Sequence, residues 1–171
     1  MEWIKTALEI IGLVTTAVAV FGFFGVVLSW LLGISPLLYR LGLGRWRRQI
    51  SIAANADNYS ALKADMVDSG VFRDKNINHI DKQGLSKVKD ANLMLVDYGS
   101  FTEQQIKTII GNKQSSAGMV VYFPGFSPTN RIPDDIAKLI NNEPHTVLVN
   151  FRGRLINDII TTLLSTSYEK K

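Results

Sequence analysis

The residues from Ala7 to Leu32 are almost entirely apolar, and this run restricts the structure of the chain more than any other feature. Its only charged side chain is Glu9, near its start. As an α-helix the run would be about 39 Å long, which exceeds the ~30 Å hydrocarbon core of a bilayer. It is too long for the apolar part of a secretory signal, it ends without an A-x-A cleavage site, and it lacks the polar face of a core helix. The sequence therefore predicts a transmembrane helix within residues 1–33.

The residues around the apolar run follow the pattern of a single-pass membrane protein. Trp3 and Trp30 bracket the run, where interfacial aromatic residues are expected. Lys5 is the only basic residue before it, whereas four basic residues follow it closely: Arg40, Arg45, Arg47 and Arg48. The positive-inside rule then predicts an inner (cytoplasmic) membrane protein with its N-terminus outside and its C-terminal domain in the cytoplasm.

Residues 34–48 are predicted to be a basic juxtamembrane linker. Two forms are open: a short interfacial helix broken by Pro36 and the glycines, or a linker that lies on the membrane. A second span is not expected, because residues 34–43 are too few to cross a bilayer and Arg40 would lie in its middle. The four arginines suit the headgroup zone and attraction to anionic lipid.

The remaining residues, 49–171, are predicted to form one cytosolic domain of nearly neutral charge. They hold 14 of the 19 Lys and Arg residues and 13 of the 15 Asp and Glu residues, a net charge of +1. This balance argues against binding to DNA. The chain has no cysteine, which excludes disulfides and thiolate metal sites.

Apolar strand-like runs alternate with helical segments along this domain. Strands are expected at residues 49–54, 76–80, 92–97, 118–123 and 146–151. Helices are expected at residues 59–69, 85–89, 102–110 and 155–165, with a further helix opened by Pro133. Strands that are apolar throughout are buried on both faces, and short helical crossovers join parallel strands. The predicted fold is a doubly wound, mainly parallel, five-stranded Rossmann-like domain.

Polar residues follow the predicted strands, at the edge of the sheet where such folds bind ligands. The candidate ligand-binding residues are Asn55, Asn58, Asp97, Ser100, Asn150, Arg152, Gly153 and Arg154. Two guanidiniums, a glycine and a helix start near Arg152 suit a phosphate group. A simpler explanation stays open for each: Asn58 as a helix cap, Asp97 as a capping acid, the arginines as solvated side chains.

The sequence predicts no catalytic residue, no metal site and no cofactor. The glycines form neither a G-x-G-x-x-G nor a Walker pattern. His79 and His145 are far apart and have no acid at metal-ligand spacing, so each is expected to be satisfied or exposed.

Two enzyme-like families share part of this pattern. The domain resembles a receiver domain in strand order, with Asp97 at the place of the phospho-accepting aspartate. Asn55 and Asp57 replace the acid pair of that family, and Asn150-Phe151-Arg152 replaces its Lys-Pro, so Mg²⁺-dependent phosphorylation is not implied. The domain also resembles a Toll/interleukin-receptor-type domain, but Ser100 and Glu103 lack the spacing of the NAD-cleaving members.

In its arrangement of parts the chain resembles membrane-anchored bacterial immune effectors with a CRISPR-associated Rossmann-fold (CARF) sensor domain. The resemblance implies antiviral defence, a cyclic oligonucleotide as the ligand, and homo-oligomers whose membrane helices form pores or perturb the bilayer. Small residues such as Gly12 and Thr16 would let such helices approach closely. The alternatives are a membrane-tethered, receiver-like protein-interaction module and a small membrane-bound enzyme that acts on a nucleotide or NAD.

Overall fold

The computed structural model describes residues 2–125 and 131–166, with the side chains of residues 43–45 left out. The chain divides into two compact units, Met1–Tyr39 and Arg40–Lys171. Each unit is described by itself below.

The first unit contains α1 (Glu2–Leu31), a helix of 30 residues that is long and apolar enough to cross a membrane. None of its residues is buried within the protein. Its hydroxyl groups bind its own backbone: Thr15 donates to the Ile11 carbonyl and Thr16 to the Gly12 carbonyl, both at 2.8 Å. Because these groups are satisfied inside the helix, they add little cost to its transfer into lipid. These features fit a single-pass membrane protein.

A second helix, α2 (Ile34–Trp46), follows α1 after Gly33, which takes a left-handed conformation with φ of +72°. Of the two predicted forms, a short helix broken by Pro36 and the glycines or a linker on the membrane, the structure has a helix, and that helix is unbroken. Pro36 lies in the first turn, where its missing N–H has no partner to lose, so α2 is continuous.

The second unit is built on a five-stranded, all-parallel sheet with strand order β2-β1-β3-β4-β5. The strands are β1 (Ile50–Ala53), β2 (Ile77–Ile80), β3 (Leu93–Asp97), β4 (Gly118–Tyr122) and β5 (Thr146–Val149). All residues of β1, β3 and β4 are buried, as their apolar sequences predict. The predicted fold class is thus confirmed, and the strand order reverses between β1 and β3.

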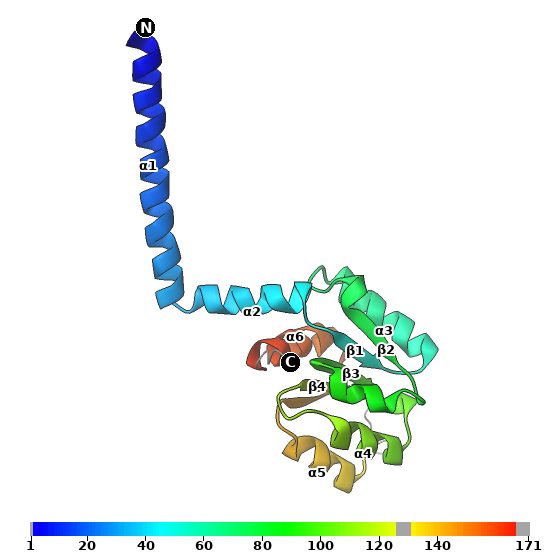
Figure 1. Cartoon of the computed structure of the whole chain (residues 1–171). Helices are drawn as coiled ribbons and strands as arrows, with labels where there is room; N and C mark the ends of the chain where they lie inside the picture. The colour runs from blue at the N-terminus through cyan, green and yellow to red at the C-terminus, as the bar shows by residue number, and fades with distance from the viewer. Residues whose placement is uncertain (1, 126–130, 167–171) are drawn as a thin grey trace. The chain divides into compact units, whose positions relative to one another are not determined.

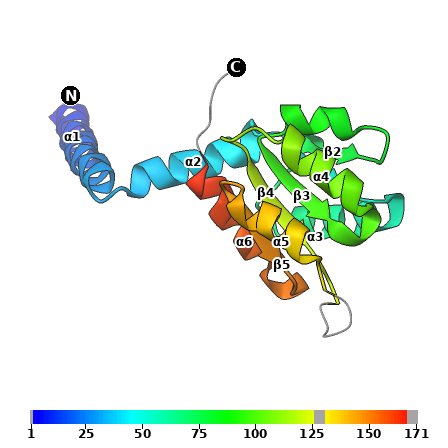
Figure 2. The same cartoon turned by 90° about the horizontal axis from the view of Figure 1, so that it is seen from below.

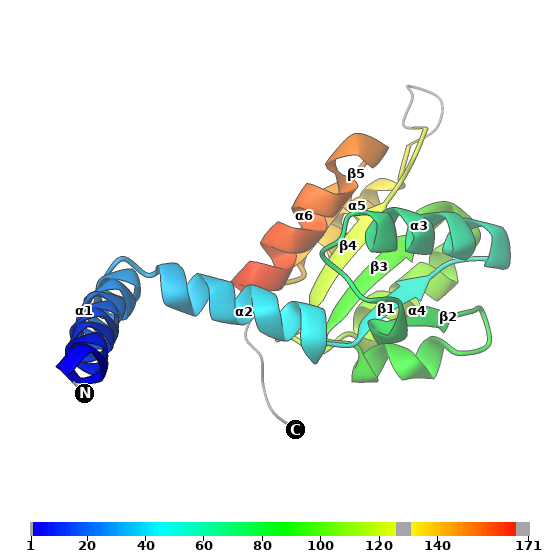
Figure 3. The same cartoon turned by 90° about the horizontal axis from the view of Figure 1, so that it is seen from above.

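Helices cover both faces of this sheet, as Figure 1 shows. The helical elements are α3 (Ala56–Asp68), η1 (Asp74–Asn76), η2 (Leu85–Asp90), η3 (Tyr98–Ser100), α4 (Glu103–Asn112), α5 (Asp134–Asn142) and α6 (Arg152–Ser165). α3 and α6 lie on one face of the sheet (Figure 3), and α4 and α5 lie on the other (Figure 2). The apolar side chains of each pair of helices pack on the strands beneath them. α6 approaches β4 so closely that a Cβ on Gly118 would lie 2.6 Å from the Thr162 methyl group.

Several helix boundaries differ from those predicted. α3 begins at Ala56, because the side chain of Asn55 caps it, and α6 begins at Arg152. α4 continues past Gly111 to Asn112. The expected helix at 85–89 is the 3-10 helix η2.

The end of the last helix is tied to the segment before the sheet. Arg48 is 1% exposed, and its Nη1 donates to the Leu163 carbonyl at 2.7 Å, while its Nη2 donates to the Thr166 carbonyl at 3.1 Å. Arg40 donates to the Leu164 carbonyl at 3.1 Å. Cations suit this position because the last carbonyls of a helix lack partners within it.

These contacts show that the four arginines of the basic cluster are not equivalent. Arg48 is buried in protein, so it does not reach lipid headgroups as expected, whereas Arg47 is exposed. The side chain of Arg45 lies outside the described residues.

Candidate functional site

Four of the predicted site residues meet where the strand order reverses, at the carboxyl ends of β1 and β3. Asp97 is the last residue of β3 and Ser100 closes η3, and both are buried, whereas Asn55 and Asn58 are exposed. Asn58 Nδ2 donates to Asp97 Oδ2 at 2.6 Å, and the Ser100 hydroxyl donates a short hydrogen bond to the same oxygen. The Asn55 backbone N–H donates to Ser100 Oγ at 2.9 Å. We call these four residues the switch-point cluster.

The local sequence explains why the cluster forms. Asn55 is the N-cap of α3, and its Oδ1 accepts from the backbone N–H of Asn58 at 2.8 Å. This bond places Asn58 one turn into the helix, with its amide turned to the end of β3. A buried carboxylate needs donors, and Asn58 and Ser100 supply two to Asp97. Asp97 and Ser100 therefore hold the loop, while the exposed Asn55 and Asn58 are the residues a ligand can reach.

The other four predicted residues lie after β5, at the start of α6. Arg152 Nε donates to Asp65 Oδ2 of α3 at 2.7 Å, and this hydrogen bond raises the pKa of Arg152. Arg154 is exposed and lies 3.7 Å from Asp158, one turn along its own helix. Asn150 is exposed, and a Cβ on Gly153 would have no atom within 4 Å, so packing does not require glycine there.

The region of Arg152 carries negative as well as positive charge, whereas the sequence suggested a cationic site. An open pocket of about 350 Å³ is lined by Asp65, Asp68, Ser69, Arg152, Gly153, Leu155 and Ile156. Two carboxylates share this pocket with one guanidinium. An anion bound here therefore has to compete with Asp65 for Arg152. The start of α6 favours the anion, since no side chain caps its first N–H groups.

Tyr122 connects the two groups of residues and was missed by the sequence reasoning. It ends β4, which lies between β3 and β5 in the sheet. Burial raises its pKa most, Arg152 lowers it, and Asp97 and Asp65 raise it. Its hydroxyl thus lies within electrostatic reach of both groups. The predicted strand ended at Phe123, so Tyr122, which is the last residue of β4, was passed over.

His79 supports the end of β1 from the neighbouring strand. Its ring stacks on Tyr59 of α3 with centroids 4.2 Å apart, and its Nε2 lies 2.8 Å from the Ala54 carbonyl oxygen. These contacts agree with the expectation that it is a satisfied histidine. Within residues 2–125 and 131–166, no group of three His, Cys, Asp or Glu side chains is placed to hold a metal ion.

Fold and site together define a class of protein: a doubly wound, all-parallel α/β domain with a polar switch-point cluster, on a chain whose first helix can span a membrane. No protein-family model matches the sequence, and no curated protein is significantly similar to it.

Proposed function

We propose that this protein is a membrane-anchored effector whose α/β domain binds an anionic nucleotide second messenger, a cyclic oligonucleotide. Binding at the carboxyl edge of the sheet alters the association of the membrane helices, and the resulting homo-oligomer forms a pore or perturbs the bilayer in antiviral defence. The protein itself performs no catalysis in this proposal.

The observation that carries the proposal is the position of the switch-point cluster. In open α/β sheets, ligands bind outside the carboxyl ends of the strands where the strand order reverses. Here that point lies between β1 and β3, and Asn55 and Asn58 are exposed there. Asn55 Nδ2 and Asn58 Oδ1 have no hydrogen-bond partner among the described residues, so each can bind a base or a ribose hydroxyl.

The start of α6 supports the anionic part of the ligand. Arg152 uses only Nε in its bond to Asp65, and its other N–H groups have no partner in the part of the chain that the structure describes. A phosphate can take these N–H groups together with the free N–H groups of the first turn of α6. Arg154 adds a second exposed cation.

A physical connection leads from this edge to the segment that follows α1. α6 starts at Arg152, and its last carbonyls accept hydrogen bonds from Arg40 of α2 and from Arg48. A shift of α6 caused by a ligand at its start would therefore reach α2 through these bonds.

The edge strand β5 supports self-association. Its residues Val147 and Leu148 are exposed, one on each face of the sheet. They lie in register with Val120 and Val121 of β4. β5 carries no charged residue that would oppose pairing with a second copy.

Dye release from vesicles tests the proposed function. We would reconstitute the full chain into vesicles that hold a fluorescent dye, and add cyclic oligoadenylates and cyclic dinucleotides from outside. At least one of these ligands is expected to release the dye. Arg152→Ala should reduce this release at least tenfold, because it removes the cation that faces the phosphate.

Lys107→Ala is the matched control for Arg152→Ala. Lys107 also forms an ion pair of 2.7 Å, with Asp135, but it lies on α4. Its replacement should leave dye release unchanged. The proposal would be contradicted if no ligand released dye, or if Arg152→Ala and wild type released equal amounts.

A further inference from the structure

The three tryptophans of the chain are all exposed. Trp3, Trp30 and Trp46 are 75%, 61% and 60% exposed. The first two lie near the two ends of α1, where interfacial aromatic residues are expected, but Trp46 is the last residue of α2. Tryptophan is highly buried on average in folded domains, so a ring open to water is uncommon. Trp46 therefore needs an explanation of its own.

Two arginines adjoin Trp46 and lack a counter-charge. The Arg73 guanidinium lies 4.1 Å from the centroid of the Trp46 ring, which is a cation–π contact. Arg47 is the next residue in the chain and is exposed. Neither arginine forms an ion pair with any residue that the structure describes, and Asp74, which follows Arg73, is paired with Lys63 at 2.7 Å. We call Trp46, Arg47 and Arg73 the Trp46 surface.

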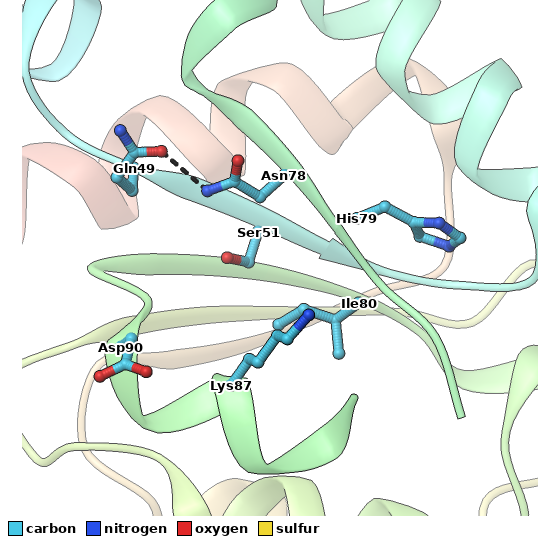
Figure 4. Close-up of a pocket in the computed structure, with 7 residues that line it drawn as sticks. All are labelled: Gln49, Ser51, Asn78, His79, Ile80, Lys87 and Asp90. Carbon is cyan, nitrogen blue, oxygen red and sulfur yellow. Dashed lines mark hydrogen bonds between the residues drawn. The ribbon is translucent and has the colours of Figure 1, made fainter. Parts of the chain in front are cut away.

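The segments that carry the Trp46 surface are attached to the α/β domain. Arg48 is buried and donates to the carbonyls at the end of α6. Gln49 lines an open pocket between β1, β2 and η2, where its Oε1 accepts from Asn78 Nδ2 at 2.7 Å (Figure 4). On the other segment, Phe72 is 3% exposed in the apolar core. The Trp46 surface is therefore presented by ordered parts of the domain.

The α2 helix begins directly after a helix that is suited to a membrane. With 30 residues, α1 is about 45 Å long, the thickness of a bilayer together with its headgroups. Only Leu32 and Gly33 lie between α1 and α2. When α1 crosses a bilayer, α2 therefore starts at the surface of that bilayer.

The α2 helix has one side on the domain and aromatic residues on the other. Leu41 packs against the apolar core beneath α3 and α6. Tyr39 and Trp46 lie on one side of the helix, about 160° and 140° around it from Leu41. Both are more than half exposed, Tyr39 at 66%. Exposed aromatic residues of this kind are typical of a helix in the interface between lipid and water.

We propose that the Trp46 surface binds the headgroups of anionic phospholipids. The guanidiniums of Arg47 and Arg73 bind the lipid phosphate, and the Trp46 ring lies among the headgroups. The bilayer is the occupant that the chain itself indicates, because α2 follows α1 and the charges of the Trp46 surface are all positive. Bound lipid then holds the α/β domain against the membrane. This inference does not depend on nucleotide binding.

Quenching of Trp46 fluorescence by brominated lipids tests the inference in the full chain. Trp3→Phe and Trp30→Phe, both at exposed positions of α1, leave Trp46 as the only tryptophan. We would reconstitute this variant into phosphatidylcholine vesicles that contain a small fraction of one brominated lipid, either phosphatidylglycerol or phosphatidylcholine. Both brominated lipids should quench Trp46, and brominated phosphatidylglycerol should quench it more strongly, because the Trp46 surface gathers anionic lipid.

Charge variants in this background identify the groups that hold the lipid. Arg73→Gln should lower the preference for phosphatidylglycerol about fivefold, the effect of the ~1 kcal/mol that one basic residue contributes near an anionic membrane. Arg47→Gln should act in the same way, and Arg73→Lys should keep most of the preference because it keeps the charge. Lys138→Gln is the matched control, since it removes an exposed charge from α5 on the other face of the sheet, and it should leave the preference unchanged.

The inference would be overturned if neither brominated lipid quenched Trp46, or if both quenched it equally. An unchanged preference in both Arg73→Gln and Arg47→Gln would also overturn it. So would an equal loss in Lys138→Gln, because that result would show attraction by net charge alone.

Discussion

Asp97 ends β3 with its carboxylate buried, and the donors that satisfy it come from two other segments, α3 and η3. Polar groups from these segments therefore help to order the carboxyl edge of the sheet. The sequence indicated this role, since a carboxylate at the end of a buried strand needs partners. It did not indicate which partners, because Asn58 and Ser100 reach Asp97 only after β1 and β3 pair.

Asp97→Ala is expected to lower the free energy of unfolding by about 1 to 3 kcal/mol, because it leaves the Ser100 hydroxyl buried without an acceptor. Chemical unfolding of the full chain in micelles, followed by circular dichroism, measures this. Asp57→Ala is the control: Asp57 is exposed in the first turn of α3, and its loss should cost under about 1 kcal/mol. Equal effects of the two changes would contradict the structural role of Asp97.

The raised pKa of Tyr122 leads us to predict that the stability of the protein changes with pH in the alkaline range. Burial is the main cause that raises its pKa above 10.0, so the folded protein holds the phenol proton more tightly than the unfolded chain does. The stabilisation that comes from this raised pKa is present in full below pH 10, and it is lost as the pH rises through the pKa of Tyr122 in the folded protein. Tyr122→Phe should therefore lose less stability than wild type between pH 9 and pH 11. An equal or larger loss in the variant would show that Tyr122 ionises in the folded protein as freely as in the unfolded chain.

Among the elements, the strands were the most predictable. β1, β3 and β4 lie within the predicted ranges, because unbroken apolar runs are buried on both faces of a parallel sheet. β5 also lies within its predicted range, although Val147 and Leu148 of this edge strand are exposed. The helix boundaries were harder to predict than the strands. For example, α6 starts at Arg152 without a side-chain cap that would mark its start in the sequence. η2 looked like an ordinary short helix, and the pocket beside it could not be predicted, since it depends on how η2 lies on β1 and β2.

The contacts at the end of α6 could not be predicted either. Arg48 looked like one of four equivalent membrane-facing arginines, and only the fold brings it to the carbonyls of Leu163 and Thr166. A local pattern of charge does not reveal a partner more than a hundred residues away in the sequence.

Arg48→Met tests whether this arginine holds the segment just before β1 against the end of α6. The variant keeps the apolar volume but removes the bonds to the carbonyls, so the free energy of unfolding should fall by about 2 kcal/mol or more. Arg47→Met removes the same charge from the neighbouring exposed position and should change it by less than about 0.5 kcal/mol. Denaturant midpoints in micelles compare the two. Similar midpoints would mean that Arg48 contributes no more than a surface charge.

At the scale of the whole molecule, a helix long and apolar enough to cross a membrane precedes an α/β domain with polar groups at the carboxyl edge of its sheet. The arrangement agrees with the predicted order of parts, and the fold brings together four of the eight predicted site residues in one cluster. The other four lie after β5, where Arg152 is joined to α3 through Asp65. We propose that both groups of residues bind one nucleotide.

Calorimetric titration of the full chain in nanodiscs with cyclic oligoadenylates and cyclic dinucleotides tests this central claim most directly. Wild type should bind at least one of these ligands. Asn58→Ala should weaken that binding about tenfold, the effect of roughly 1.4 kcal/mol, while Ser60→Ala on the same helix should leave it unchanged. Absence of binding to every ligand, or equal affinity in wild type and Asn58→Ala, would contradict a nucleotide site at this edge of the sheet.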